Sequence, residues 1–274
     1  MSDKDKKNFF SVRYKILGIL LLAVGLLVIT NVYALRNYQQ DLTEQLNLTL
    51  QQSLTSNINM LEQSIQNHIN SLHTFANVEV VQGDDKQAAM DYLKMELAHQ
   101  TSLSGNWFES LGLIGLDGWA VNSDDAPVDL SERDYFKAVV NGADFAISAP
   151  MISKVSGNVA VMMAVPVKRN GQLVHVLYSR LDLAELNQQI IAMKYGEKGR
   201  AYLTDAAGVT IAHPNKDLLL KNLTKVEGPV TEELARMTNQ AVASKKGQGE
   251  YTFEGVKSIN SYQTIPTTGW ILST

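Results

Sequence analysis

The chain has 274 residues, of which 45% are hydrophobic, with a formal net charge of −4 and no cysteine. The negative charge argues against a nucleic-acid-binding surface, and the lack of cysteine fits a bacterial periplasmic domain as well as a reducing compartment. The roughly 240 residues after the apolar N-terminal segment are enough for one large or two small hydrophobic cores.

An apolar segment of 20 residues, Ile16 to Leu35, follows a basic N-terminus. A helix of this length, rising about 1.5 Å per residue, crosses the roughly 30 Å hydrocarbon core of a bilayer. Five lysines and arginines precede the segment, whereas Arg36 is the only basic residue between it and Lys86. This charge bias predicts that residues 1–15 are cytoplasmic, 16–35 cross the inner membrane and 36–274 lie in the periplasm.

The alternative for this segment is a cleaved secretory signal. Val32, Tyr33 and Ala34 would form an acceptable cleavage site for one. The helical pattern runs through these residues without a turn residue, which favours one continuous helix from the membrane into the ectodomain.

A helical period continues from Leu35 to Phe75. No proline or glycine interrupts it, and its apolar residues recur every three or four positions: Leu35, Tyr38, Leu42, Leu46, Leu50, Leu54, Ile58, Leu61, Ile65, Ile69 and Leu72. The pattern predicts a long helix within residues 36–80 with one buried stripe. Such a helix can be a coiled-coil stalk or the spine of a folded domain, and we expect both roles.

The next residues predict a first module of antiparallel strands. Asp117-Gly118 and Asn170-Gly171 are hairpin turns between apolar segments, namely Leu111–Leu116 with Trp119–Asn122 and Val159–Val167 with Leu173–Leu181. Helices are expected at Lys86–His99, at Ser131–Val140 with Ser131 as its N-cap, and at Leu183–Met193.

A shorter version of the same pattern follows. Strands are expected at Arg200–Thr204, Val209–His213, Gly249–Phe253, Ser258–Thr264 and Trp270–Ser273, with a helix at Thr231–Ala243. The predicted fold is α+β, with two tandem PAS-like antiparallel-sheet modules carried by one long helix. We place the membrane-distal module at 81–193 and the membrane-proximal module at 194–274.

Ordered motifs in both modules resemble the double Cache (dCache) sensor domain over residues 36–274. In the distal module they are Leu130–Ala138, Ser148-Ala149-Pro150, Ser156-Gly157 and Ala164–Val167; in the proximal module they are Gly196–Leu203, Ala212–Lys216 and Thr268-Gly269-Trp270. The resemblance implies a periplasmic domain that dimerises through its long helix and binds a small molecule, mostly in the distal module.

The resemblance also implies a role in signalling. Such domains feed methyl-accepting chemotaxis proteins, which we expect here, and the alternative is a membrane diguanylate cyclase or histidine kinase. The output module would lie outside this chain, beyond Thr274. A structural tether that binds no ligand is a third possibility.

In family members that sense amino acids, an Arg-x-aromatic-aromatic motif holds the ligand carboxylate. Arg133, Tyr135 and Phe136 match this motif. A planar guanidinium with five N–H donors suits a carboxylate. The alternative is that Arg133 pairs with a neighbouring acid, Asp134 or Glu132, on a solvated turn.

The ammonium-binding half of the family site is altered. Where Tyr-x-Asp is expected the sequence has Met151 and Ser153, and Arg180 stands where a later aspartate is expected. Two arginines in one site would favour a carboxylate or another organic anion, including a dicarboxylate, over an amino acid. Alternatively, a one-residue change of register would point Arg180 outward, or Arg180 would pair with Asp182 or Glu185.

Other chemistry has little support in the sequence. The five histidines have no metal-ligand spacing, and neither a phosphate-binding glycine loop nor a Gly-x-Ser-x-Gly motif is present. We therefore expect no enzyme activity, metal or cofactor.

Overall fold

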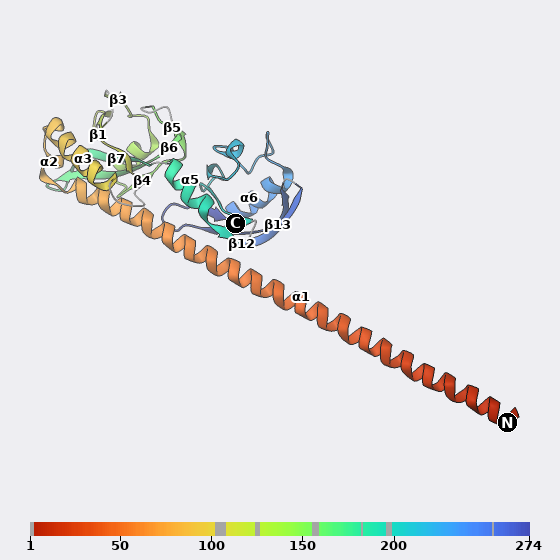
Figure 1. The fold of residues 1–274 in the computed structure, drawn as a ribbon. Helices are drawn as coiled ribbons and strands as arrows, with labels where there is room; N and C mark the ends of the chain where they lie inside the picture. Colours follow the sequence, from red (N-terminus) through yellow and green to blue (C-terminus); the bar gives the residue numbers. More distant parts are fainter. Residues whose placement is uncertain are drawn as a thin grey trace. The chain divides into compact units, whose positions relative to one another are not determined.

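The computed structural model describes residues 3–101, 108–123, 127–154, 159–181, 183–195, 199–253 and 255–274 (Figure 1). The chain divides into two compact units, Met1–Gln52 and Ser53–Thr274. Helix α1 extends from Asp3 to Ala76, so its C-terminal part belongs to the second unit. This extent confirms the predicted long helix, which continues unbroken through Val32, Tyr33 and Ala34.

The N-terminal part of α1 has the composition of a membrane span. Its most apolar 18-residue window has a mean hydropathy of 2.5, and among the described residues α1 is the one helix long and apolar enough to cross a membrane. Its apolar side chains are exposed, Leu22 at 72% and Ile29 at 69%. Exposed side chains of this kind are what a lipid-facing helix presents.

Within the second unit, α1 buries the predicted apolar stripe. The buried members recur every three or four residues: Leu54, Ile58, Leu61, Ile65, Ile69, Leu72, Phe75 and Ala76. The earlier members Tyr38, Leu42 and Leu46 are exposed in the single chain. The stripe is therefore the face through which α1 packs on the folded unit, and it starts later than its period alone suggests.

The first sheet contains seven strands in the order β3-β2-β1-β7-β6-β4, with β5 pairing on β6, and all pairs are antiparallel. The strands are β1 (Phe108–Gly115), β2 (Trp119–Asn122), β3 (Val128–Asp129), β4 (Ala146–Ile147), β5 (Met151–Ile152), β6 (Val159–Arg169) and β7 (Gln172–Leu181). The helices of this region are α2 (Glu79–Gln82), α3 (Lys86–Thr101), α4 (Asp134–Val140) and α5 (Leu183–Ala192). Helix α3 and both hairpins confirm the sequence prediction.

Both predicted hairpin turns have the backbone that their residues suggest. Asn170 and Gly171 have positive φ angles of 53° and 80°, as a two-residue type I′ turn requires. Gly118 has a φ of 84°, and a Cβ there would lie 2.4 Å from the Cβ of Ser131. Glycine at position 118 thus serves both the turn and the close approach of the next segment.

Helix α4 begins later than predicted, and Ser131 is not its cap. Arg133 is the N-cap, while the Ser131 N–H donates to Asp129 Oδ1 at 2.9 Å. The Arg133 N–H donates to the Leu130 carbonyl at 3.0 Å. These bonds form a turn over residues 129–133, because a short acidic side chain competes well for nearby backbone N–H groups.

The second sheet has five strands in the order β11-β10-β14-β13-β12. The strands are β10 (Tyr202–Thr204), β11 (Thr210–Ala212), β12 (Lys246–Phe253), β13 (Val256–Thr264) and β14 (Ile271–Ser273), with a separate pair β8 (Lys194–Tyr195) and β9 (Gly199–Arg200). The accompanying helices are η1 (Lys216–Leu218) and α6 (Glu232–Ser244). The order β11-β10-β14-β13 corresponds to β2-β1-β7-β6 of the first sheet, so the two sheets share this part of their topology, as the repeated pattern predicted. The predicted strand at 200–204 is split.

Polar contacts connect α1 to the first sheet and to segments next to the second sheet. The Asn57 amide donates to the Tyr195 hydroxyl at 2.6 Å, and the Thr267 N–H donates to Glu62 Oε2 at 3.1 Å. His68 Nε2 lies 3.0 Å from Ser179 Oγ on β7, and its ring stacks on Phe108 with centroids 3.6 Å apart. The middle of α1 therefore contacts the first sheet directly opposite the side chains that face α4.

Burial of His68 predicts a loss of stability in acid. Burial lowers the pKa of His68 to about 3 from an ordinary value of 6.5. Its neutral form therefore stabilises the fold fully above pH 6.5, and this contribution falls by about 1 kcal/mol per pH unit as pH drops toward 3. The unfolding free energy of His68→Gln, measured by urea denaturation at pH 7.5 and 5, should fall less than that of the wild type.

Asn67→Ala is the matched control, because Asn67 is exposed next to His68 on the same helix and carries no titratable group. It should keep the wild-type pH dependence. His213, whose pKa burial lowers to about 4, contributes equally in all three proteins. Equal pH dependence of His68→Gln and wild type would contradict the role assigned to His68.

Candidate functional site

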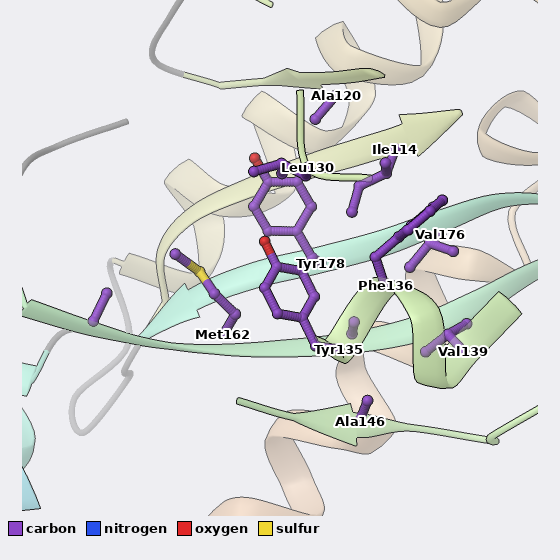
Figure 2. Packing of buried hydrophobic residues seen from close by; sticks show 12 residues of the cluster. Ile114, Ala120, Leu130, Tyr135, Phe136, Val139, Ala146, Met162, Val176 and Tyr178 are labelled. Carbon is purple, nitrogen blue, oxygen red and sulfur yellow. The ribbon is translucent and has the colours of Figure 1, made fainter. Parts of the chain in front are cut away.

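The candidate site lies between α4 and the first sheet (Figure 2). A buried cluster fills this region: Ile114, Ala120, Leu130, Tyr135, Phe136, Val139, Ala146, Ala160, Met162, Ala164, Val176 and Tyr178. The rings of Tyr135 and Tyr178 are 6.3 Å apart, and Figure 2 shows both hydroxyl groups pointing away from Ala146. The cluster is thus apolar in its walls but has two phenol groups within it.

Strand register places Arg180 on this same face. Arg180 is paired with Ser110 and Met162, and Tyr178 is paired with Gly112 and Ala164. Since side chains two residues apart on a strand share a face, Arg180 lies on the side of Tyr178 and of α4. Arg180 therefore lies on the α4 side of the sheet, and its part in a ligand site stays a prediction.

Tyr178 lies across Gly112 on the neighbouring strand. A Cβ at position 112 would be 2.6 Å from the Tyr178 ring. Any larger residue at 112 would push the ring off β1. The glycine thus lets Tyr178 lie flat over the strand, beside Ser110, which is fully buried.

Arg133 is half-buried at the start of α4 and lies at the edge of the cluster. Its Nη1 lies 3.3 Å from the Met151 sulfur, a weak acceptor. Its Nε is buried and has no hydrogen-bond partner among the described residues. The predicted alternative of a pair with Glu132 is not observed, because Glu132 lies 2.7 Å from Lys137 Nζ instead.

The two aromatic residues of the predicted motif, Tyr135 and Phe136, occupy the first turn of α4. They are 2% and 6% exposed. Burial raises the pKa of Tyr135 to about 12, so its hydroxyl stays protonated at neutral pH and can donate a hydrogen bond. Both residues therefore contribute to the wall of the site, and Tyr135 also adds a donor.

Met151 and Ser153 lie where the family pattern has its Tyr-x-Asp. Met151 begins β5 opposite Ala160 of β6, and Ser153 is 2% exposed. The structure thus brings Arg133 and Met151 together, and neither position 151 nor position 153 supplies a carboxylate.

Arg180 has a partner that sequence analysis did not predict. Its Nε lies 3.0 Å from Glu109 Oε2, and its side chain is 5% exposed. The alternative partner Glu185 instead accepts a bond from Gln189, and Asp182 lies outside the described residues. The register shifts between Phe108 and Ser110, and this irregularity takes Glu109 out of the strict alternation that would place it on the opposite face.

Removal of one partner of the Glu109–Arg180 pair should be strongly destabilising. Glu109→Gln would leave a buried cation with no opposite charge, so the unfolding free energy should fall by about 2–4 kcal/mol. Replacing both partners, as in Glu109→Leu with Arg180→Met, should recover most of this loss. Chemical denaturation of the single and double variants measures both effects.

Glu132→Gln is the control for this experiment, since Glu132 pairs with the exposed Lys137. An exposed pair contributes little, so that variant should be close to wild type. A Glu109→Gln variant as stable as Glu132→Gln would show that the buried pair does not hold Arg180.

Sequence analysis missed Glu109, Ser110, Asn122 and Tyr178. Asn122 is 6% exposed and pairs with Gly112 across β1 and β2, which puts it on the same face as Ser110. Ser110 Oγ is buried with no hydrogen-bond partner among the described residues. Because buried polar groups are normally satisfied, Ser110 Oγ and Arg133 Nε mark a place where a polar ligand group could bind.

The described residues contain no group of three His, Asp or Glu side chains that could hold a metal ion. The side chains described above give the site hydrogen-bond donors and aromatic walls.

A family model for the Cache domain, dCache_1, matches residues 34–274. Among curated relatives, the methyl-accepting chemotaxis protein McpA of Pseudomonas putida is 29% identical over 95% of this chain and 39% of its own length. PscA of Pseudomonas syringae pv. tomato, also a methyl-accepting chemotaxis protein, is 25% identical over 54% of this chain and 22% of its own. The chain thus spans less than half the length of these relatives.

Solved structures show the same fold. The ligand-binding domain of the Pseudomonas fluorescens chemoreceptor CtaA, in complex with L-serine, has a TM-score of 0.66 at 20% identity and covers 84% of this chain and 96% of its own. The ligand-binding domain of the Pseudomonas aeruginosa amino acid chemoreceptor PctB, in complex with L-Arg, has a TM-score of 0.60 at 19% identity, with coverages of 77% and 86%. These similarities confirm the predicted α+β fold.

Proposed function

The chain belongs to the dCache_1 family of Cache domains, and on this basis we propose that it is the sensory region of a transmembrane chemoreceptor. In this proposal it binds a small carboxylate in the periplasm and passes the signal across the inner membrane. The chemotaxis relatives support the receptor class, and the apolar, exposed N-terminal part of α1 supports the membrane anchor.

The observation that carries the ligand proposal is the half-buried Arg133. Its Nε is buried without a hydrogen-bond partner among the described residues. Its Nη1 lies against the thioether sulfur of Met151, which is a weak acceptor. A carboxylate would give this guanidinium the two parallel bonds that it lacks. Tyr135, whose high pKa keeps its hydroxyl protonated, would line the same place.

The charge balance refines the ligand class. Glu109 neutralises Arg180, so the two arginines and this glutamate sum to one positive charge. This balance favours a monocarboxylate over the dicarboxylate suggested by two arginines. Met151 and Ser153 offer no carboxylate for an ammonium group, so we propose an organic acid in preference to an amino acid.

The contact between β7 and α1 supports a route for the signal. Arg180 faces the site, while the preceding Ser179 bonds to His68 on α1. A shift of β7 on ligand binding would therefore displace Ser179 and, through its contact with His68, also α1. We propose that α1 moves against its partner in a homodimer, which a ligand can drive only if it binds one state better.

A thermal-shift screen of residues 37–274 tests this function. Propanoate, lactate and pyruvate have the three-carbon carboxylate skeleton of L-alanine but lack its ammonium group. Comparison of the four compounds therefore separates recognition of the carboxylate from recognition of the ammonium group. Stabilisation by the acids supports the proposal. Stabilisation by alanine alone would refute the proposed ligand class. If no compound in a wider set of organic acids raised the melting temperature, the proposal of a carboxylate sensor would be refuted.

A further inference from the structure

A cavity lies between the two sheets, at the exposed face of α5. Its volume is about 760 Å³, which is within the range of small-molecule sites. The α5 residues that line it recur at helical spacing, Ala184, Asn187, Gln188 and Ile191, and β11 contributes Thr210 and Ile211 from the edge of the second sheet.

This cavity is separate from the α4 site. Its described lining residues come from β1, the start of β6, α5, β11 and the segment 216–220, and none comes from α4. Glu109 also lines the cavity, but its carboxylate pairs with Arg180. A molecule bound here would therefore touch neither Arg133 nor Tyr135.

Hydrogen bonds link the elements that line the cavity. The Asn187 side chain accepts the His213 N–H at 2.9 Å, which ties α5 to the residue after β11. Leu220 has a positive φ of 61°, and its N–H donates to the Thr210 carbonyl at 3.1 Å. These bonds hold Leu219 and Leu220 at the cavity, where both remain partly exposed.

The chemistry of the lining points to an amphiphile. Leu183, Ile191 and Leu219 give an apolar wall. Lys216 is exposed at the same cavity, and none of the ion pairs found among the described residues includes it. The Glu109 charge is already balanced by Arg180, so Lys216 gives the cavity a positive side.

We propose that this cavity binds a second small molecule, an amphiphilic acid with an apolar body against α5 and an anionic group at Lys216. The geometry allows it to bind together with a ligand at the α4 site. The inference does not depend on which ligand the α4 site takes.

The test uses the full chain in lipid nanodiscs and calorimetric titration with three probes: 4-phenylbutanoate, 4-phenylbutan-1-ol and 4-phenylbutylamine. The acid should bind saturably and more tightly than the amine. Lys216→Gln should lower the affinity for the acid by about threefold, because it removes an exposed charge contact, and it should leave the affinity for the alcohol unchanged. Ala184→Trp should fill the cavity and lower the affinities for the acid and for the alcohol by tenfold or more.

Ala192→Trp is the matched control, since Ala192 is an exposed alanine of α5 that does not line the cavity. It should bind all probes like the wild type. Absence of saturable acid binding, or equal binding by Ala184→Trp and Ala192→Trp, would overturn the inference. Binding lost in Arg133→Ala but kept in Ala184→Trp would place the probe at the α4 site, which overturns this inference and leaves the proposed function standing.

Discussion

Arg133→Ala is expected to weaken the binding of a small carboxylate by about 10- to 100-fold. Charge-assisted hydrogen bonds to a partly buried guanidinium are worth about 1.5–3 kcal/mol, and alanine removes them all. The fold should survive, because Arg133 caps α4 without a side-chain capping bond. Calorimetric titration with the acid that gives the largest thermal shift measures the loss.

Two further variants make this result specific. Arg133→Lys should bind with intermediate affinity, since a lysine keeps the charge but not the bidentate geometry. Arg169→Ala removes an exposed arginine of the same sheet, paired with Asp84 at 2.9 Å, and should leave affinity unchanged. Equal affinity of wild type and Arg133→Ala would show that the carboxylate binds elsewhere.

Leu61→Ala is expected to lower the free energy of unfolding by about 2–5 kcal/mol. Leu61 is 1% exposed in the middle of the buried stripe of α1. Its truncation removes apolar contacts and leaves a cavity that a regular helix cannot close. Urea denaturation of residues 37–274, with the slope checked for two-state behaviour, measures the effect.

Met60 provides the neighbouring control, since it is 50% exposed on the same turn. Met60→Ala should change the unfolding free energy by less than about 0.5 kcal/mol. Similar losses in the two variants would mean that the stripe is not the face that packs on the sheets.

The sequence predicted the fold wherever a strong local signal existed. Asn170-Gly171 permits few conformations other than a tight turn, and the period of α1 is sustained over many turns. Two-residue strands such as β4 and β5 are too short to show a period, so they were missed. The start of α4 was misplaced because Asp129 and Ser131 can form either a cap or a turn, and tertiary contact with Gly118 selects the turn.

The candidate site was only partly predictable. Arg133, Tyr135 and Phe136 came from the family motif, and Arg180 came from the position of the family's later aspartate. The period of two along the same strand would have placed Tyr178 on the face of Arg180, a signal that was available but not used. Glu109 had no such signal, because it depends on a register shift between Phe108 and Ser110 that hydrophobic alternation does not reveal.

We propose that a carboxylate binds at Arg133 between α4 and the first sheet. The decisive measurement is a crystal structure of residues 37–274 with the acid that gives the largest thermal shift. We predict carboxylate oxygens within hydrogen-bond distance of the Arg133 guanidinium, with Tyr135 and Tyr178 around the ligand. A ligand bound in the second module, with Arg133 still against Met151, would show that Arg133 is not the binding residue.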